Sequence, residues 1–206
     1  MVRFKNNALI LIIMETLISL LNDAIQERPD EIAIKDLNTG LDFTYTQLGA
    51  NIQRYANNLR KLGVRRGSRV AIVCQNTPDF LFADYAVMSL GAISVPIDEE
   101  LKPAHMLRTY INFVEPKIVL TDSENFSNVL ENTDNIPVRS FMDVRHNSEH
   151  HDPVEISEND ISTIIFSSGT SSESDQSFKA IQLSHGNIAS NILDCGDVLK
   201  SKKRLT

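Results

Sequence analysis

The chain has 206 residues, of which 42% are apolar and 23% charged, a composition typical of a soluble globular protein with enough mass for a real core. Its formal net charge of −7 excludes a nucleic-acid backbone as the main partner, because proteins that bind such backbones need a basic surface. An acidic balance still leaves room for a nucleotide in one local pocket.

The N-terminus carries an apolar run at residues 8–14, preceded by Arg3 and Lys5. The run superficially suggests a signal peptide, but no small-residue cleavage site follows, and it is too short to span a bilayer. A second interpretation takes Met14 as the true start and residues 1–13 as an uncertain extension; the helical pattern that begins at Met14 favours it. We therefore expect no membrane span.

The two cysteines are distant in sequence and form no metal-like or redox-like pair, which fits a reducing cytoplasm.

The first regular elements are a helix, a hairpin and a second helix. Apolar residues recur at helical spacing from Met14 until Pro29, and residues 31–36 and 41–43 then predict two short strands around a turn. Thr44 and Gln47 have the spacing of a capping box, so a helix should begin there, and Gly63 supplies its end.

An α/β rhythm follows. Strands are predicted at residues 69–74, 92–98 and 117–122, separated by helices that begin at Pro78 and Pro103. Pro96 places the second strand near a sheet edge or marks the strand's end. This order predicts a mostly parallel sheet with helices on both faces and functional groups at the carboxyl ends of its strands. Asp98 and Asp122 lie at such ends, although most carboxylates there merely cap turns or helices.

The remaining segments are more polar. We expect a short helix at residues 124–130, a strand at 138–142, a strand at 160–166 and a last helix from residue 184 with Ile188, Ile192 and Leu199 inward. A loop at residues 145–153 holds three histidines and two carboxylates, but their spacing fixes no ligand geometry and we predict no metal site. Residues 200–206 form a basic tail that should fray.

The strand at residues 160–166 runs directly into a cluster of hydroxyls and a glycine, and a lysine follows some residues later. Backbone N–H groups, hydroxyls and an ammonium group are the donors that hold phosphate oxygens, and a glycine allows close approach. No Gly-Lys-Ser/Thr ends the loop, so it is not the nucleotide P-loop pattern, and by itself it also fits an ordinary solvated loop. The candidate phosphate-binding residues are Ser167, Ser168, Gly169, Thr170, Ser171 and Lys179.

The chain resembles the N-terminal part of the adenylate-forming enzymes, which include acyl-CoA synthetases, peptide-synthetase adenylation domains and luciferase. That family has an aromatic residue, Thr-Ser-Gly-Thr-Thr-Gly, then Pro-Lys-Gly and Leu-Ser-His-x-Asn. The corresponding residues here are 166–171, Lys179 and 183–187. Residues 28–34, 43–48 and 90–98 resemble further family segments in the same order, so the likeness extends over residues 28–187.

The resemblance implies the first part of the adenylate-forming N-terminal domain, with residues 14–199 as an incomplete AMP-binding domain. It implies that a carboxylic acid and ATP, with Mg²⁺, form an acyl-adenylate, and that coenzyme A or a carrier pantetheine then takes the acyl group. Ser167 to Ser171 and Lys179 would hold the β- and γ-phosphates, and no residue is implied as a catalytic nucleophile. The family's adenine, acid and ribose sites and its catalytic lysine lie further along, so we expect no adenylation by this chain alone. The upstream segments favour an acyl-CoA synthetase of fatty acid metabolism.

Several positions depart from the family pattern. Ser172 and Ala180 replace glycines, Phe178 replaces the proline, and about four extra residues, among them Glu173 and Asp175, lie before Lys179. A residue other than glycine hinders a backbone that needs positive φ, and carboxylates beside a triphosphate repel it. The alternative hypothesis is therefore a non-catalytic interaction or regulatory module derived from this fold.

Overall fold

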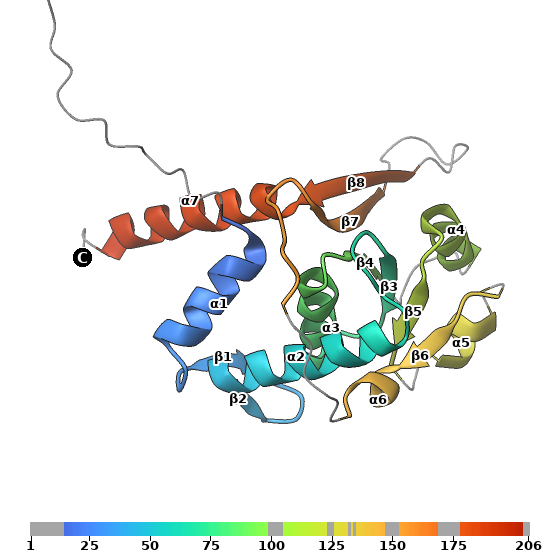
Figure 1. Ribbon diagram of the computed structural model, residues 1–206, viewed down its shortest axis with the longest axis horizontal. Coiled ribbons are helices and arrows are strands. Elements are labelled where there is room, and N and C mark those ends of the chain that lie inside the picture. Colours follow the sequence, from blue (N-terminus) through green and yellow to red (C-terminus); the bar gives the residue numbers. More distant parts are fainter. Residues whose placement is uncertain are drawn as a thin grey trace, which may run out of the picture.

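The computed structural model describes residues 15–98, 105–122, 126–131, 133, 135–146, 153–168 and 178–203. Its centre is a six-stranded sheet with the strand order β6-β5-β3-β4-β7-β8 (Figure 1). The neighbours from β6 to β7 are parallel, and β7 and β8 are antiparallel. The strands are β3 Arg69–Val73, β4 Ile93–Ile97, β5 Ile118–Thr121, β6 Val138–Ser140, β7 Ile161–Ser168 and β8 Phe178–Ser184. The predicted mostly parallel α/β fold is confirmed.

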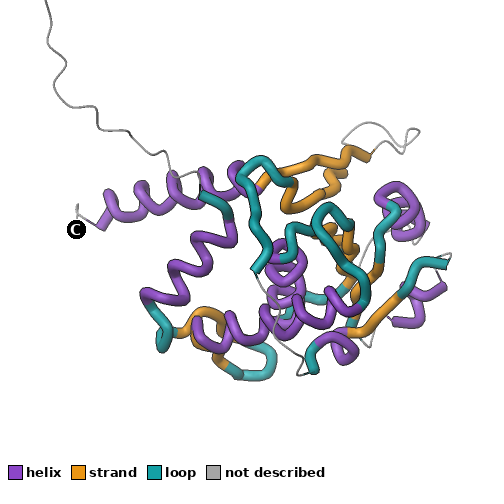
Figure 2. Tube along the Cα trace, in the orientation of Figure 1, coloured by secondary structure: helices purple, strands orange, loops and turns teal. Residues whose placement is uncertain are grey.

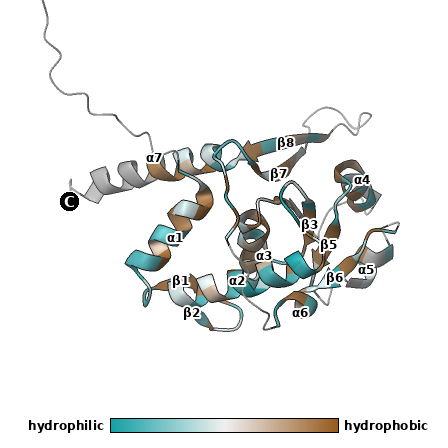
Figure 3. Cartoon of the chain, in the orientation of Figure 1, coloured by the Kyte–Doolittle hydropathy of each residue, from teal (hydrophilic) through white to brown (hydrophobic). Residues whose placement is uncertain are grey.

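Helices cover both faces of the sheet because its central strands are apolar on both sides. In β3, Val70 and Ile72 pack into a core formed with α2 and α3, whereas Ala71 and Val73 pack into a second core formed with α4. Figure 3 shows β3 and β5 in the brown of apolar residues. The covering helices are α2 Tyr45–Lys61, α3 Pro78–Ser89, α4 His105–Val114, α5 Phe126–Glu131 and α6 Phe141–Val144.

The N-terminal elements have the predicted order. Helix α1 is Leu17–Glu27, and β1 Ile32–Lys35 pairs antiparallel with β2 Asp42–Thr44 in a hairpin that lies apart from the main sheet (Figure 2). The Thr16 side chain accepts from the Ser19 backbone N–H at 3.0 Å and thus caps α1, so the helix begins after Thr16 rather than at Met14.

The capping box predicted for α2 is present. The Gln47 backbone N–H donates to Thr44 Oγ1 at 3.3 Å, and the Thr44 backbone N–H donates to Gln47 Oε1 at 2.8 Å. Gly63 follows the helix with φ +89°, a conformation that glycine adopts without a steric penalty.

Strand β4 is interior, between β3 and β7, so Pro96 lies at the strand's end, one of the two placements predicted for it. Two other segments differ from the prediction. The predicted strand at residues 138–142 is shorter, because Phe141 and Met142 begin α6 after a Ser140 cap. Strand β8 was not predicted at all.

The last helix, α7 His185–Lys203, begins as predicted, because the Asn187 backbone N–H donates to Ser184 Oγ at 3.2 Å. It runs through Lys203, whereas the sequence predicted fraying from residue 200. Ile192 was expected to be buried but is 44% exposed. Among the described helices, none is long and apolar enough to cross a membrane.

Candidate functional site

The phosphate-loop candidates lie where β7 and β8 meet at the end of their hairpin. Ser167 pairs with Lys179 across the two strands, and Ser168 pairs with Phe178. The two ends of the predicted loop are therefore neighbours, although eleven residues separate Ser167 from Lys179 in the sequence. Gly169, Thr170 and Ser171 lie outside the described residues, as do Ser172 and the acidic positions 173 and 175.

Because successive side chains of a strand point to opposite sides, the β7–β8 hairpin has two faces that carry different residues. Phe166, Phe178 and Ala180 pack against the core that contains α4. Ser167 and Lys179 directly face each other across the strands and therefore share the opposite face, where Ser167 is half-buried and Lys179 exposed. A hydroxyl and an ammonium group thus stand side by side at the carboxyl end of β7, where α/β sheets bind ligands.

Ala180 does not strain the backbone, contrary to the concern raised by its replacement of a family glycine. It lies in the regular ladder opposite Phe166, and it is not among the described residues with positive φ. Phe178, the residue in place of the family's proline, is likewise a β8 strand residue.

An aromatic cluster joins the end of the β7–β8 hairpin to α4 and was not predicted. The Phe166 ring stacks on Tyr110 of α4 with a centroid distance of 4.0 Å, and the Phe178 ring meets Tyr110 edge-on at 4.8 Å. Phe113 of α4 completes the cluster at 5.2 Å from Phe178. The sequence offered one partial signal, the apolar–polar–apolar order of Phe178, Lys179 and Ala180, which fits a strand with one buried face but does not indicate the contacts with α4.

The carboxyl ends of the parallel strands hold the two aspartates singled out in the sequence. Asp122 Oδ2 accepts from the Gln75 backbone N–H at 3.1 Å and so joins the loops after β3 and β5. Asp98 lines a cavity of about 480 Å³ with Cys74, Asn76, Phe80 and neighbouring residues of β3 and β4. Asp122 is thus a loop-capping carboxylate, as such residues usually are.

The opposite end of the hairpin is anchored by Asp160, His185 and Arg66. Partial burial works to raise the pKa of Asp160, but hydrogen bonds from the Ser157 backbone and the Arg66 guanidinium outweigh it and hold that pKa below its usual value. His185, at the start of α7, is fully buried, and neither of its ring nitrogens has a hydrogen-bond partner among the described residues. Burial lowers the pKa of His185, and the Asp160 carboxylate partly opposes this.

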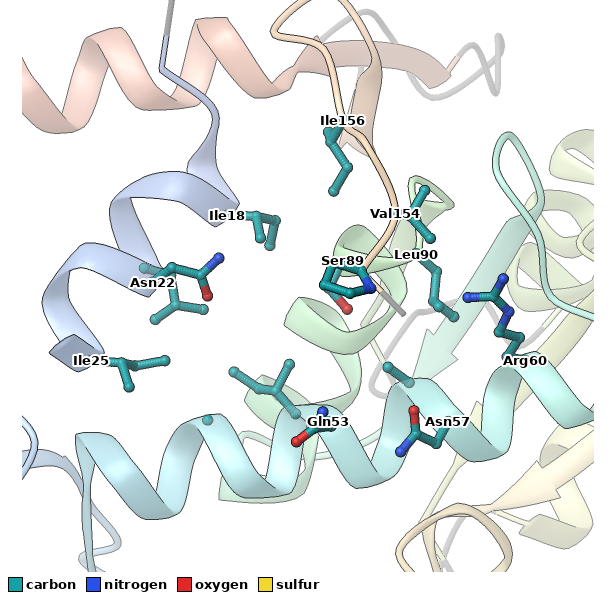
Figure 4. Close-up of a pocket in the computed structure, with 15 residues that line it drawn as sticks. Ile18, Asn22, Ile25, Gln53, Asn57, Arg60, Ser89, Leu90, Val154 and Ile156 are labelled. Atoms are coloured by element: carbon teal, nitrogen blue, oxygen red, sulfur yellow. The ribbon is translucent and has the colours of Figure 1, made fainter. Parts of the chain in front are cut away.

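A separate cavity of about 360 Å³ lies between α1, α2 and residues 153–156 (Figure 4). Its walls are mostly aliphatic, with Asn22, Gln53, Asn57 and Arg60 among them, and no residue of β7 or β8 contributes. The described residues contain no group of three potential metal ligands; of the predicted histidine loop, only residues 145, 146 and 153 are described.

The mostly parallel α/β sheet places Ser167 and Lys179 at the carboxyl end of a strand, where open α/β sheets bind ligands. The family model described as AMP-binding enzyme matches residues 21–205, and the chain therefore belongs to this family. The adenylate-forming resemblance drawn from the sequence is confirmed.

The relatives include several synthetases. The hybrid PKS-NRPS synthetase xenE of Xenoacremonium sinensis is 30% identical over 180 residues, which are 86% of this chain and 4% of that protein. The fatty acid–[acyl-carrier-protein] ligase MmaC of Mycobacterium marinum is 34% identical over 105 residues, or 52% of this chain and 20% of that protein. This chain therefore spans a small part of these relatives.

Solved structures share the fold. VinN superimposes with a TM-score of 0.72 and 27% identity, covering 84% of this chain and 44% of that one. The o-succinylbenzoate coenzyme A synthetase MenE of Bacillus subtilis, in complex with its acyl-adenylate intermediate, gives a TM-score of 0.74 at 22% identity, covering 87% of this chain and 45% of MenE. The chain corresponds to less than half of either structure.

Proposed function

We propose that this chain provides the ATP phosphate-holding part of an acid–thiol ligase that activates a carboxylate as an acyl-adenylate. The observation that carries the proposal is the direct pairing of Ser167 with Lys179, which brings both ends of the hydroxyl-rich loop together at the carboxyl end of β7. Membership of the AMP-binding enzyme family supports it.

The residues fit a polyphosphate by their chemistry. Lys179 supplies a compact positive charge with three donors, and the serine and threonine hydroxyls of the loop donate to phosphate oxygens. Described side chains of the hairpin end carry no carboxylate that would repel the anion. Mg²⁺, when bound, would neutralise part of the charge on the phosphates.

In the proposed reaction, Lys179 and the loop hydroxyls act as positioning groups for the phosphates. A carboxylate oxygen of the acid attacks the α-phosphorus, the bond to the bridging oxygen of pyrophosphate breaks, and pyrophosphate leaves with the electron pair. Lys179 and the loop hydroxyls would stabilise the charge that develops on the departing phosphates. A thiol, from coenzyme A or a carrier pantetheine, would then displace AMP from the acyl group.

We propose that other parts of a complete ligase select the acid and the thiol. Relatives named as PKS-NRPS synthetases and as a fatty acid–[acyl-carrier-protein] ligase support an acyl or aminoacyl substrate with a thiol acceptor. Because the chain aligns with under half of VinN and MenE, we propose that the acid pocket and adenine site are supplied by further parts of a complete ligase, and that this chain alone does not turn over.

A second candidate function is that of a non-catalytic module that has the same fold but does not bind ATP. The acidic insertion before Lys179, with Glu173 and Asp175, favours it because these charges oppose a triphosphate. The two candidate functions differ in whether Lys179 binds ATP.

The test is titration calorimetry of Mg-ATP and of inorganic tripolyphosphate into the chain and two variants. Lys179→Ala should abolish measurable binding, whereas Lys35→Ala, an exposed lysine on the β1–β2 hairpin, should leave it unchanged. Equal behaviour of all three proteins would favour the non-catalytic module. Pyrophosphate exchange with a panel of fatty and amino acids should give no turnover; clear exchange by this chain would contradict the proposal that further parts are needed.

A further inference from the structure

The tip of the β7–β8 hairpin has little support from the main sheet. Ser94 of β4 lies opposite Thr163 of β7, so in this register β4 ends at Ile97 beside Phe166, and only Ser167 and Ser168 of β7 extend beyond it. Strand β8 is an edge strand that pairs with β7. The hairpin end that carries Ser167 and Lys179 therefore extends beyond its parallel neighbour and needs another support.

Helix α4 supplies that support through aromatic rings. Phe166 immediately precedes Ser167, and Phe178 immediately precedes Lys179. Both rings contact Tyr110, at centroid distances of 4.0 and 4.8 Å, and both contact Phe113, at 6.3 and 5.2 Å. Phe166 and Phe178 are themselves 5.5 Å apart in an edge-to-face arrangement. Each end of the phosphate loop is thus adjacent to a residue that packs on the same helix.

Helix α4, which carries two of these rings, is itself held in place by buried side chains and by a hydrogen bond to α5. Leu107, Ile111 and Val114 of α4 are buried in the core on that face of the sheet, and Tyr110 is only 6% exposed. Arg108 also donates to the Glu131 carbonyl at 2.8 Å and ties α4 to α5. Edge-to-face and stacked ring pairs each contribute about 0.5–1.5 kcal/mol beyond the area they bury.

We propose that Tyr110, Phe113, Phe166 and Phe178 form an aromatic clamp that holds the two ends of the phosphate loop side by side. Phe178 is the decisive member, because it faces both α4 rings from the edge strand, and we assign it as a positioning residue. The link to phosphate affinity rests on the proposed function of the loop. The clamp itself rests on the ring geometry alone.

Four proteins test the clamp. Phe178→Leu keeps an apolar side chain and removes the ring, and Phe178→Trp keeps a ring. Phe80→Leu removes a partly buried ring from the other core and serves as the matched control. Because the chain contains no tryptophan, Phe178→Trp also places a single fluorescent reporter at the base of the loop. Two readouts are measured for each protein: amide hydrogen exchange at the hairpin end, and affinity for Mg-ATP.

We expect Phe178→Leu to speed exchange at Ser167, Ser168 and Lys179 while exchange in β3 and β5 stays unchanged. Affinity for Mg-ATP should fall about two- to tenfold, the range that the loss of one ring pair gives. Phe178→Trp should restore both, and its emission should shift when Mg-ATP is added. Phe80→Leu should change neither readout at the hairpin.

Three failures are distinguishable. If the unaltered chain does not bind Mg-ATP, the proposed function fails together with the link to affinity, while the exchange rates still decide whether the clamp exists. If Phe178→Leu exchanges at the hairpin end like the unaltered protein, the clamp is overturned whatever the affinity. If exchange rises but Mg-ATP affinity does not change, the rings support the hairpin without positioning the phosphates, and the assignment of Phe178 is overturned.

Discussion

Arg66 donates a hydrogen bond of 2.7 Å to the Asp160 carboxylate, joining the loop before β3 to the start of β7 across 94 positions of sequence. The same guanidinium donates to the Glu155 carbonyl at 2.9 Å. The segment that delivers β7, and with it the candidate phosphate loop, is thereby fixed to the sheet's central βαβ unit.

The Arg66→Ala variant should lower the free energy of unfolding. Arg66 is about half exposed, so the ion pair itself is screened by solvent; we expect a loss of about 1 kcal/mol, mainly from the two hydrogen bonds. Urea unfolding followed by circular dichroism measures it. Arg54→Ala is the control, since Arg54 is half-buried and donates to the Ala50 carbonyl of its own helix. Equal stability of the two variants would contradict the anchoring role.

His185 should make stability depend on pH in the weakly acidic range. Its pKa is lowered in the folded state by burial, so the unfolded chain takes up a proton below the usual value of 6.5 while the folded chain resists it. The free energy of unfolding is therefore full above about pH 6.5 and falls as the pH drops below that value.

The measurement is urea unfolding at several pH values between 5 and 7.5. His185→Asn should remove part of this slope, whereas His146→Asn, at an exposed histidine, should keep it. The pKa of the Asp160 carboxyl group is also lowered in the folded state, but its contribution to stability is lost only as the pH falls below 3.8, the usual value for an aspartate. A slope between pH 5 and 6.5 that is identical in all three proteins would rule out His185 as its source.

A buried tyrosine joins the two helices on the α2–α3 face. The Tyr55 hydroxyl donates to the Asp79 carboxylate in the first turn of α3, and burial, followed by this carboxylate, raises the pKa of Tyr55 above its usual range. Tyr55→Phe should cost about 1.5–3 kcal/mol, the usual value for a hydrogen bond to a charged group. Thermal and urea unfolding measure it, with Tyr45→Phe as the control at a half-buried tyrosine. A cost no greater than that of the control would show that the bond does not stabilise the pair.

Local signals in the sequence predicted the elements well where the deciding contacts are local. The Thr44–Gln47 capping box and the turn before β2 depend on residues a few positions apart, and both form as expected. The sequence could not decide between a sheet edge and the strand's end for Pro96, because strand order depends on pairing with β7, which lies about 70 residues further on. Pro96 alone could not report that.

The candidate site likewise contains features with local sequence signals, which were predicted, and features that depend on distant contacts, which were not. The hydroxyl cluster and Lys179 were visible as a motif, but their pairing required β8, and no strand was predicted for its residues. The stacking of Phe166 on Tyr110 joins residues 56 positions apart, and no local pattern encodes it. His185 is polar and begins a helix, which usually indicates solvent, yet the contacts of Asp160 and Glu158 with the start of α7 bury it.

Two glycines near Arg66 provide a last, internally controlled test of the anchor. Gly91 and Gly67 both have positive φ, +64° and +77°, so an alanine at either position is strained. A Cβ on Gly91 would also lie 3.1 Å from Arg66 Cγ, whereas a Cβ on Gly67 would meet nothing within 4 Å. We expect Gly67→Ala to cost about 1 kcal/mol from strain and Gly91→Ala to cost more, because it also displaces the Arg66 side chain.

A double-mutant cycle separates the two contributions. In the Arg66→Ala background the crowding atom is gone, so Gly91→Ala should cost only the strain and approach the value for Gly67→Ala, which should itself be the same in both backgrounds. Urea unfolding of the six proteins gives the coupling free energy directly. Additive effects of Gly91→Ala and Arg66→Ala would mean that the guanidinium does not depend on the packing of its stem over Gly91, and that the anchor at Asp160 tolerates displacement of the side chain.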